Sequence, residues 1–188
     1  MKTKKKSVRI ARNFILGKVY NSRWVLERAA RDYALRLEVE KIKRKSAFLA
    51  QSIVKIRECE SAEELLGIEG EAASVYFSVF DDLILQQKTD FYFQGRNKRP
   101  PLDSVNAMLS FAYSLLAGMC GSALEAVGLD SYVGFFHTDR PGRISLALDL
   151  MEEFRSVMAD RFVLTLINKK VMKPEYFIKK RKWCCYHE

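Results

Sequence analysis

The sequence contains no long apolar run, no internal repeat and no low-complexity tract. Its longest apolar runs, such as residues 162–167, are far shorter than the roughly 20 residues that a bilayer span requires. The basic start of the chain resembles a signal peptide only briefly, because Arg9 and Arg12 interrupt the segment that follows. We therefore predict a cytoplasmic protein without a membrane partner.

Cysteine is also scarce. The four cysteines, Cys59, Cys120, Cys184 and Cys185, match neither a zinc-binding pattern nor a disulfide framework, so we expect reduced thiols. The rest of the composition is ordinary for a globular domain, since 48% of the residues are hydrophobic and 29% are charged. A chain of 188 residues is long enough for one domain with a core of its own.

Positive charge is concentrated at the two ends of the chain. Residues 1–26 carry eight Lys and Arg and no acid, residues 27–167 carry 17 bases against 21 acids, and residues 168–188 carry seven against two. A mildly acidic body with basic ends suits a protein that neutralises phosphates. Solvated tails that only keep the protein soluble would give the same distribution, so charge alone leaves both interpretations open.

Helical periodicity dominates after residue 22 and predicts a mainly α-helical fold. We predict that Ser22 caps a helix, that a second amphipathic helix spans residues 39–56, and that a capping box at residues 61–64 starts a helix running toward Gln87. A loop over residues 88–103 follows.

Two more helices complete the prediction. The first is capped by Asp103 or Ser104 and stops at Gly128. The second runs from about Ser145 to Asn168. The apolar side chains of this last helix that we expect to point inward are Leu146, Leu150, Phe154, Val157, Met158 and Phe162.

Two acids and one histidine stand out as candidates for chemistry. Glu69 shares a helical face with apolar positions, and Glu152 lies three residues after Asp149, so that these two acids project side by side. His137 follows the apolar residues 134–136 in a short connection, either a buried linker or a short strand, that should hold it inside. Carboxylates with one imidazole suit Mg²⁺ or Mn²⁺, the ions of phosphoryl transfer.

Each of these residues also has an ordinary explanation. Two acids three residues apart often form a solvated helix face, an acid near a helix start complements the helix dipole, and a buried histidine is often a hydrogen-bonded core residue. Periodicity does not show whether the three segments meet.

The motifs around these residues are more specific than the residues alone. They are Gly67-Ile68-Glu69-Gly70-Glu71-Ala72-Ala73, Asn106 followed by Tyr113, Gly134-Phe135-Phe136-His137, and Leu148-Asp149-Leu150-Met151-Glu152-Glu153-Phe154-Arg155. Their order and spacing resemble the family of the universal CRISPR adaptation integrase, the first-named Cas protein. Residues 11–18 and 77–87 resemble its subtype I-C branch most closely, and the resemblance extends from about Ser7 to Lys180.

The resemblance implies an activity. Members of this family are homodimeric, metal-dependent DNA endonucleases and integrases. Together with a small ferredoxin-like Cas partner, they insert foreign DNA into a CRISPR array by transesterification of phosphodiester bonds. The implied substrate is double-stranded or branched DNA, and the implied cofactor is Mg²⁺ or Mn²⁺.

The resemblance also implies the site. By the family's motifs, Glu69, His137 and Glu152 would be the catalytic metal ligands, with Asp149 beside them. Candidates for phosphate contacts are Arg140, Arg143 and Arg155, which lie close to these ligands in the sequence. Surface arginines without such a role would look the same in the sequence.

The chain departs from the family at both ends. We expect residues 1–21 to be a basic remnant of the family's N-terminal β-domain, residues 22–180 to be the helical catalytic domain, incomplete at its C-terminus, and residues 181–188 to be an aberrant tail produced by a frameshift. The side chains expected to be exposed or mispacked because that β-domain is absent are Ile15, Leu16, Val19 and Trp24. The alternative function is an inactive remnant that binds nucleic acid through its basic ends.

Overall fold

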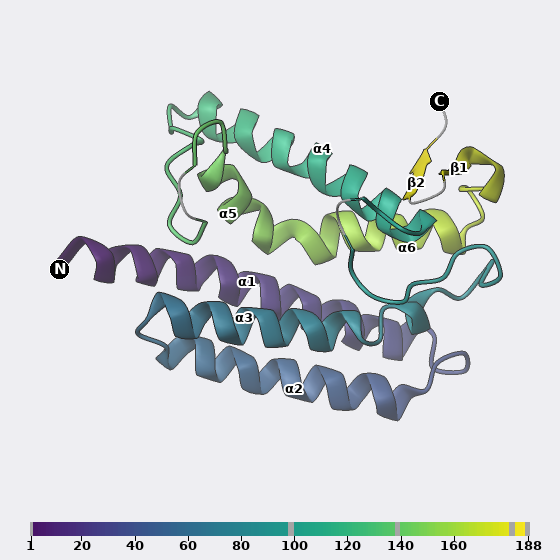
Figure 1. Ribbon diagram of the computed structural model, residues 1–188. Helices are drawn as coiled ribbons and strands as arrows, with labels where there is room; N and C mark the ends of the chain where they lie inside the picture. Colours follow the sequence, from purple (N-terminus) through teal and green to yellow (C-terminus); the bar gives the residue numbers. More distant parts are fainter. Residues whose placement is uncertain (1, 98–99, 138–139, 181–182, 187–188) are drawn as a thin grey trace.

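Helices make up most of the molecule, which confirms the predicted fold class (Figure 1). The computed structural model describes residues 2–97, 100–137, 140–180 and 183–186, with side chains described at residues 7–97, 100–137 and 140–178. The helices are α1 (Lys2–Asp32), α2 (Val39–Glu58), α3 (Ala62–Phe77), α4 (Ser104–Ala126), α5 (Ser145–Phe154) and α6 (Arg161–Asn168). The shorter elements are 3₁₀ turns at Asp81–Leu83 and Pro174–Tyr176, a π-helical turn at Arg155–Asp160, and the strands β1 (Phe177–Lys180) and β2 (Trp183–Tyr186).

The helices form two layers that meet along α1. In Figure 1, α1, α2 and α3 lie side by side in one layer, and α4, α5 and α6 form the other. α1 contacts α2 and α3 within its own layer and α5 in the other layer. Side chains from both layers fill the core, among them Ile15 of α1, Leu109 of α4 and Met151 of α5, all fully buried. α1 is therefore the element that places the first layer against α5.

α1 begins earlier than the sequence predicted. It runs from Lys2 without a break past Ser22, which is a buried residue inside the helix, so the prediction that Ser22 is an N-cap is wrong. Ile15, Val19, Ser22 and Leu26 follow one another at helical spacing and are all buried. A continuous buried face of this kind outweighs a local capping preference. Residues 2–21 are thus helical, while their origin in a β-domain stays a prediction.

The side chains expected to be exposed on α1 behave in two ways. Ile15 and Val19 are buried and Leu16 packs against the core, so for these three the expectation is wrong. Trp24 is 48% exposed, as expected. α2 and α3 cover the apolar face of α1, which explains why most of it is buried within this chain.

α3 starts as predicted and ends early. The Ser61 hydroxyl accepts a hydrogen bond from the backbone N–H of Glu64 at 3.1 Å, which is the first half of the predicted capping box. The helix ends at Phe77 instead of continuing toward Gln87. The Asp81 carboxylate accepts the N–H of Phe93 at 2.7 Å and folds the following loop back onto the end of α3.

α4 has the predicted ends. The Asp103 carboxylate accepts the N–H of Asn106 at 2.7 Å, and the chain leaves the helix at Gly128 with a φ of 76°. Among the described residues, α4 is the one helix long and apolar enough to cross a membrane by length and composition, although no long uninterrupted apolar run marks it in the sequence. Core helices pass the same test, and α4 packs on α5.

The last helical run has the predicted extent but buries a different face. Met158 and Phe162 are 45% and 55% exposed, so the prediction that they point inward is wrong. Leu146, Leu150, Phe154 and Val157 are partly buried against the core. The polar stripe is buried more completely, since Ser145, Asp149, Glu152 and Ser156 are at most 2% exposed. Buried charges require partners, and those of Asp149 and Glu152 lie in the site described below.

The end of the chain forms a short hairpin. β1 and β2 pair antiparallel, with Phe177 opposite Tyr186. The predicted aberrant tail overlaps β2, while Arg181, Lys182, His187 and Glu188 lie outside the described residues. A frameshifted origin of this tail stays a prediction.

Candidate active site

Three side chains predicted from distant segments come together between the two layers. Glu69 comes from α3, Glu152 from α5, and His137 from the loop between α4 and α5. The His137 Nε2 atom lies 3.8 Å from Glu152 Oε1. Glu69 and Glu152 both form ion pairs with the ammonium of Lys18, which lies 2.7 Å from Glu152 Oε2. The structure therefore brings these three residues into one site around a residue of α1.

Asp149 holds the loop that carries the histidine. Its fully buried carboxylate accepts the backbone N–H groups of Phe135, Phe136 and His137 at 2.6, 2.9 and 2.9 Å. Burial alone would raise the pKa of Asp149, but the hydrogen bonds from the His137 ring and from these backbone groups lower it. This loop is a partly buried linker, and its described residues form no strand.

The same carboxylate orients the imidazole. His137 Nδ1 lies 2.6 Å from Asp149 Oδ1. When Nδ1 donates its hydrogen to Asp149, the neutral ring keeps its lone pair on Nε2, the atom that faces Glu152. Asp149 is thus placed to position the histidine and not to bind an ion itself.

Glu152 is a buried acid surrounded by positive charge. It is 2% exposed, and in addition to Lys18 it has Arg155 Nη1 at 3.3 Å from its Oε1 atom. Burial would raise the pKa of Glu152, but the charges of Lys18 and Arg155 lower it below its usual value. The carboxylate is therefore held in its ionised form, which is the form that binds a cation.

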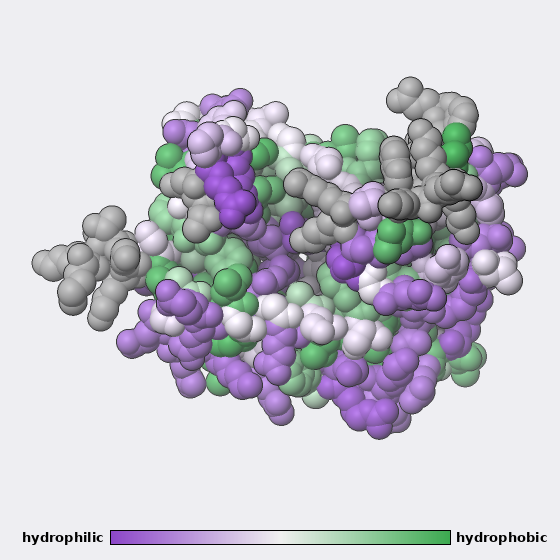
Figure 2. All heavy atoms as spheres, viewed as in Figure 1, coloured by the Kyte–Doolittle hydropathy of each residue, from purple (hydrophilic) through white to green (hydrophobic). Residues whose placement is uncertain are grey.

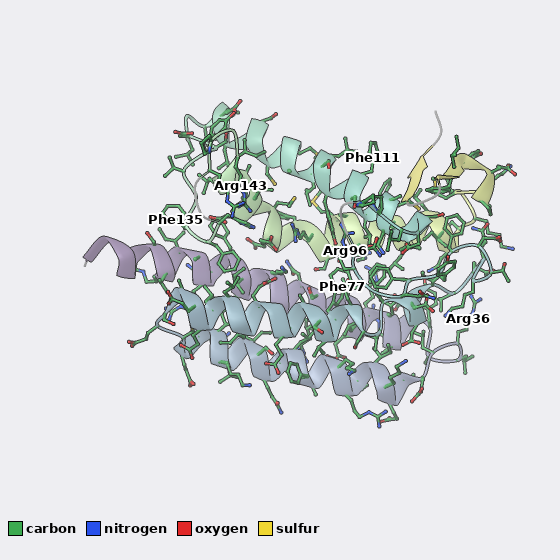
Figure 3. The ribbon with its side chains drawn as sticks, in the orientation of Figure 1. Arg36, Phe77, Arg96, Phe111, Phe135 and Arg143 are labelled. Atoms are coloured by element: carbon green, nitrogen blue, oxygen red, sulfur yellow. The ribbon has the colours of Figure 1, made fainter. Side chains whose placement is uncertain are left out.

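The three arginines predicted to contact phosphate lie in different surroundings. Arg155 lies in the site, with its Cζ atom 4.8 Å from the centre of the Tyr113 ring. Arg140 is exposed and Arg143 is half-buried, both in the turn that leads into α5. Figure 3 shows Arg143 on the same loop as Phe135, and so at the histidine side of the site. The structure thus brings Arg155 into contact with Glu152, whereas among the described residues Arg140 and Arg143 form no ion pair with the acids of the site.

A cavity of about 670 Å³ opens beside Lys18 and Glu69. Its other walls include Phe77, Arg96 and Tyr113. Figure 2 shows this hollow between the two layers, with hydrophilic residues around it, and Figure 3 shows Arg96 and Phe77 near one another beside it. Positive charge and aromatic surface next to acids are suited to a phosphate and its base.

Arg96 is held at the cavity by the Asn residue of the second motif. Asn106 is fully buried, and its side-chain oxygen accepts from Arg96 Nη1 at 2.8 Å and from the Asn97 N–H at 3.1 Å. Its amide nitrogen donates to the Gly95 carbonyl at 2.9 Å. Asn106 therefore fixes the described part of the long loop onto α4.

The Tyr residue of the same motif, Tyr113, contacts a buried acid that the sequence patterns did not identify as a candidate. The Tyr113 hydroxyl donates to Asp160, which is 2% exposed at the end of the π-helical turn. Burial raises the pKa of Asp160 to about 6, and the hydrogen bond from Tyr113 only partly offsets this effect. Single π-helical turns inside α-helices are frequent at functional sites, and this one places Arg155 and Asp160 on the cavity wall.

The sequence also gave no reason to select Lys18. Lys18 lies in the segment 11–18, which resembles the family. However, lysine is common on a basic helix, so its presence there does not indicate a site. Nothing in its spacing connects it with acids of α3 and α5, because only the packing of α1 on both layers brings them together.

The ligand atoms that Glu69, Glu152 and His137 offer are of the kind that a hard divalent cation prefers. Two carboxylates and one imidazole with a free Nε2 are ligands for Mg²⁺ or Mn²⁺. Among the described residues, however, no three His, Cys, Asp or Glu side chains are grouped closely enough to hold a metal ion as they stand. The ammonium of Lys18 lies between Glu69 and Glu152 and supplies the positive charge that these acids require.

Comparison with known proteins gives one consistent family. The profile of the family described as CRISPR associated protein Cas1 matches residues 1–188. A CRISPR-associated endonuclease Cas1 of Chlorobaculum tepidum is 51% identical over 160 residues, which are 85% of this chain and 47% of that protein. The Cas1 endonuclease of Leptospira interrogans is 48% identical over 171 residues, which are 91% of this chain and 67% of that protein.

Solved structures agree in fold over almost the whole chain. A casposase bound to its integration product has a TM-score of 0.80 and 31% identity, over 97% of this chain and 49% of that one. A Cas1 protein from Thermotoga maritima has a TM-score of 0.80 and 28% identity, over 97% of this chain and 54% of that one.

The chain therefore spans about half to two thirds of the length of these relatives. The closer resemblance to subtype I-C is not tested by them and stays a prediction. The match of the family profile over all residues, together with these relatives and the shared helical fold, shows that the chain belongs to the CRISPR-associated protein Cas1 family.

Proposed function

We propose that this chain carries the catalytic centre of a Cas1 integrase, a metal-dependent enzyme that joins foreign DNA to a CRISPR array by phosphodiester transesterification. The observation that carries the proposal is the meeting of Glu69, His137 and Glu152 from three elements at one site, in which Glu152 is buried and the other two are partly buried. In this reaction a 3′ hydroxyl oxygen bonds to phosphorus as the bond from phosphorus to the departing 3′ oxygen breaks. One phosphodiester replaces another, and a proton passes from the attacking hydroxyl to the departing oxygen.

The residues of the site have separate tasks in this proposal. The carboxylates of Glu69 and Glu152 and the Nε2 atom of His137 would hold Mg²⁺ or Mn²⁺. Such an ion, when bound, stabilises the charge on the phosphate and on the attacking and leaving oxygens. Asp149 keeps the imidazole in the tautomer that has a free Nε2. Arg155 faces the cavity and would contact the phosphate. We propose supporting phosphate contacts from Arg140 and Arg143, in the turn that leads into α5.

Partners follow from the relatives and are likewise proposals. The casposase neighbour is bound to an integration product, and we propose double-stranded or branched DNA as the substrate of this chain. We further propose that it acts in the cytoplasm, as a homodimer and with a small ferredoxin-like Cas protein.

The test is cleavage and joining of branched DNA with Mg²⁺ or Mn²⁺ and with a chelator. Activity should require the metal and should vanish in Glu69→Ala, His137→Ala and Glu152→Ala. Glu71→Ala is the matched control, because Glu71 lies on α3 two residues from Glu69 but is exposed. Metal-independent cleavage, or equal activity in the Glu152→Ala protein, would refute the proposal.

A second candidate function rests on the charge of the chain. With a net charge of +9 and basic residues concentrated at its two ends, the chain would be an inactive protein that binds nucleic acid through those ends. This function predicts salt-sensitive DNA binding without cleavage, unchanged by substitutions at residues 69, 137 and 152. The same assay, combined with a binding titration, separates the two.

A further inference from the structure

The ammonium of Lys18 occupies the position between the two acids of the site. It forms an ion pair with Glu69 and lies 2.7 Å from Glu152 Oε2, and its side chain is only 13% exposed. Two carboxylates that share one ammonium repel each other when no cation lies between them. Lys18 removes this repulsion in the absence of any metal ion.

The backbone around Lys18 is fixed by close packing of α1 on α5. A Cβ atom at Gly17 would lie 2.8 Å from Glu153 Cγ, so the absence of a side chain at residue 17 permits the close approach of the two helices. Asn21 Nδ2 also donates to the Glu153 carbonyl at 2.8 Å. The start of the Lys18 side chain is therefore held in place by the fold.

The ammonium at the end of the same side chain is held by its two ion pairs and not by the backbone. A lysine carries its charge on a flexible four-carbon stem, so the ammonium can leave the two acids without a movement of the helix. Lys18 also lines the cavity that Arg96 and Arg155 line. An ammonium that swings away from the carboxylates thus has this cavity beside it.

We infer that Lys18 is an internal counter-cation, which holds the place of the divalent ion between Glu69 and Glu152 and has to be displaced when that ion binds. This inference rests on the proposed function, because it takes these two acids as metal ligands. It has two consequences. Lys18 stabilises the metal-free protein, and it weakens metal binding, since the entering ion has to break two ion pairs.

The test is a calorimetric titration of the full chain with Mn²⁺, combined with thermal unfolding in chelator and in Mn²⁺. The variants are Lys18→Met and Lys18→Gln, which remove the charge but keep most of the stem. Lys41→Met is the matched control, because Lys41 forms a comparable ion pair at 2.7 Å, with Asp82 and not with either acid of the site. Both Lys18 variants should bind Mn²⁺ at least about tenfold more tightly than the unmodified chain, and Lys41→Met should not.

Thermal unfolding gives an independent readout. In chelator the Lys18 variants should melt at a lower temperature than the unmodified chain, and Mn²⁺ should close this gap. A variant that folds only after Mn²⁺ is added would agree with the inference, whereas variants that stay unfolded in Mn²⁺ would contradict it. Unchanged or weaker Mn²⁺ binding in both Lys18 variants would also overturn it.

The two proposals fail in different ways. If the unmodified chain binds Mn²⁺ and Glu152→Ala does not, the metal site of the proposed function stands whatever the Lys18 variants do. If neither the unmodified chain nor the Lys18 variants bind Mn²⁺, then both the metal site and the displacement of Lys18 are refuted.

Discussion

Asp149 accepts a hydrogen bond from His137 through Nδ1 at 2.6 Å and also accepts the backbone N–H of the same residue at 2.9 Å. One buried carboxylate thus fixes both the main chain and the ring of the histidine. The remaining ring nitrogen, Nε2, faces Glu152. The histidine is therefore oriented before any ligand arrives, which lowers the cost of assembling the site.

The first prediction concerns this carboxylate. Asp149→Asn replaces an acceptor-only group by an amide, whose nitrogen cannot accept the backbone N–H groups of the loop. We expect Mn²⁺ affinity to fall by about 10-fold to 100-fold, the range typical for partners of metal-binding histidines. A calorimetric titration measures it. Asp130→Asn is the control, since Asp130 accepts a backbone N–H at 2.9 Å in the same connection but is exposed. Equal losses in both variants would show that the effect is not specific to the histidine.

The second prediction concerns Gly134, at the start of the histidine loop. A Cβ atom there would lie 2.6 Å from Ser145 Cβ and 2.7 Å from the His137 carbonyl oxygen. Gly134→Ala should therefore lower the free energy of unfolding by about 1–3 kcal/mol, as overpacking does, because the loop has to shift.

Urea unfolding measures this effect against a matched control. Gly118→Ala lies in α4 with no atom within 4 Å of the added Cβ, so it should raise stability by about 1 kcal/mol. A Gly134→Ala protein as stable as the unmodified chain would mean that the loop tolerates a side chain at this position.

The third prediction concerns pH. The folded protein holds the pKa of Asp160 at about 6, above the ordinary value of 3.8, so the folded state binds this proton more tightly than the unfolded state. The resulting stability is fully present below about pH 4 and is lost as pH rises through about 6. The difference between the two pKa values corresponds to about 3 kcal/mol.

Asp160→Asn isolates this contribution, because the amide oxygen still accepts from Tyr113 but does not titrate. The free energy of unfolding of the unmodified chain, relative to the variant, should fall between pH 4 and pH 7. Urea unfolding at several pH values measures it. A difference that stays constant over this range would contradict the raised pKa.

The fourth prediction concerns Arg155 and DNA. If Arg155 contacts a phosphate, Arg155→Met should weaken DNA binding and reduce the slope of log affinity against log salt by about 1. Fluorescence anisotropy at several salt concentrations measures this slope. Arg44→Met is the control, since Arg44 lies on α2 with a side chain that is 71% exposed. Equal slopes for all three proteins would place Arg155 outside the DNA contact.

Much of the fold follows from local patterns. Ser61 caps α3 and Asp103 caps α4, as the sequence predicts, because a cap depends on residues within one turn. The prediction fails where contacts across the molecule compete with local preference. Ser22 lies inside α1 instead of capping it, and Met158 and Phe162 face outward. In each case, packing against the neighbouring helices determines which side chains are buried.

The sequence by itself determined the family, the helical class and the identity of Glu69, His137 and Glu152 as candidates, because motifs and periodicity are properties of short segments. Only the tertiary structure decided that these residues meet, that Asp149 orients the histidine through hydrogen bonds, and that Lys18 lies between the acids. The physical reason is that electrostatic and hydrogen-bond energies depend on distance in space. The distance from α1 to α3 and α5 is set by helix packing, as at Gly17 of α1, where an added Cβ atom would meet Glu153 of α5.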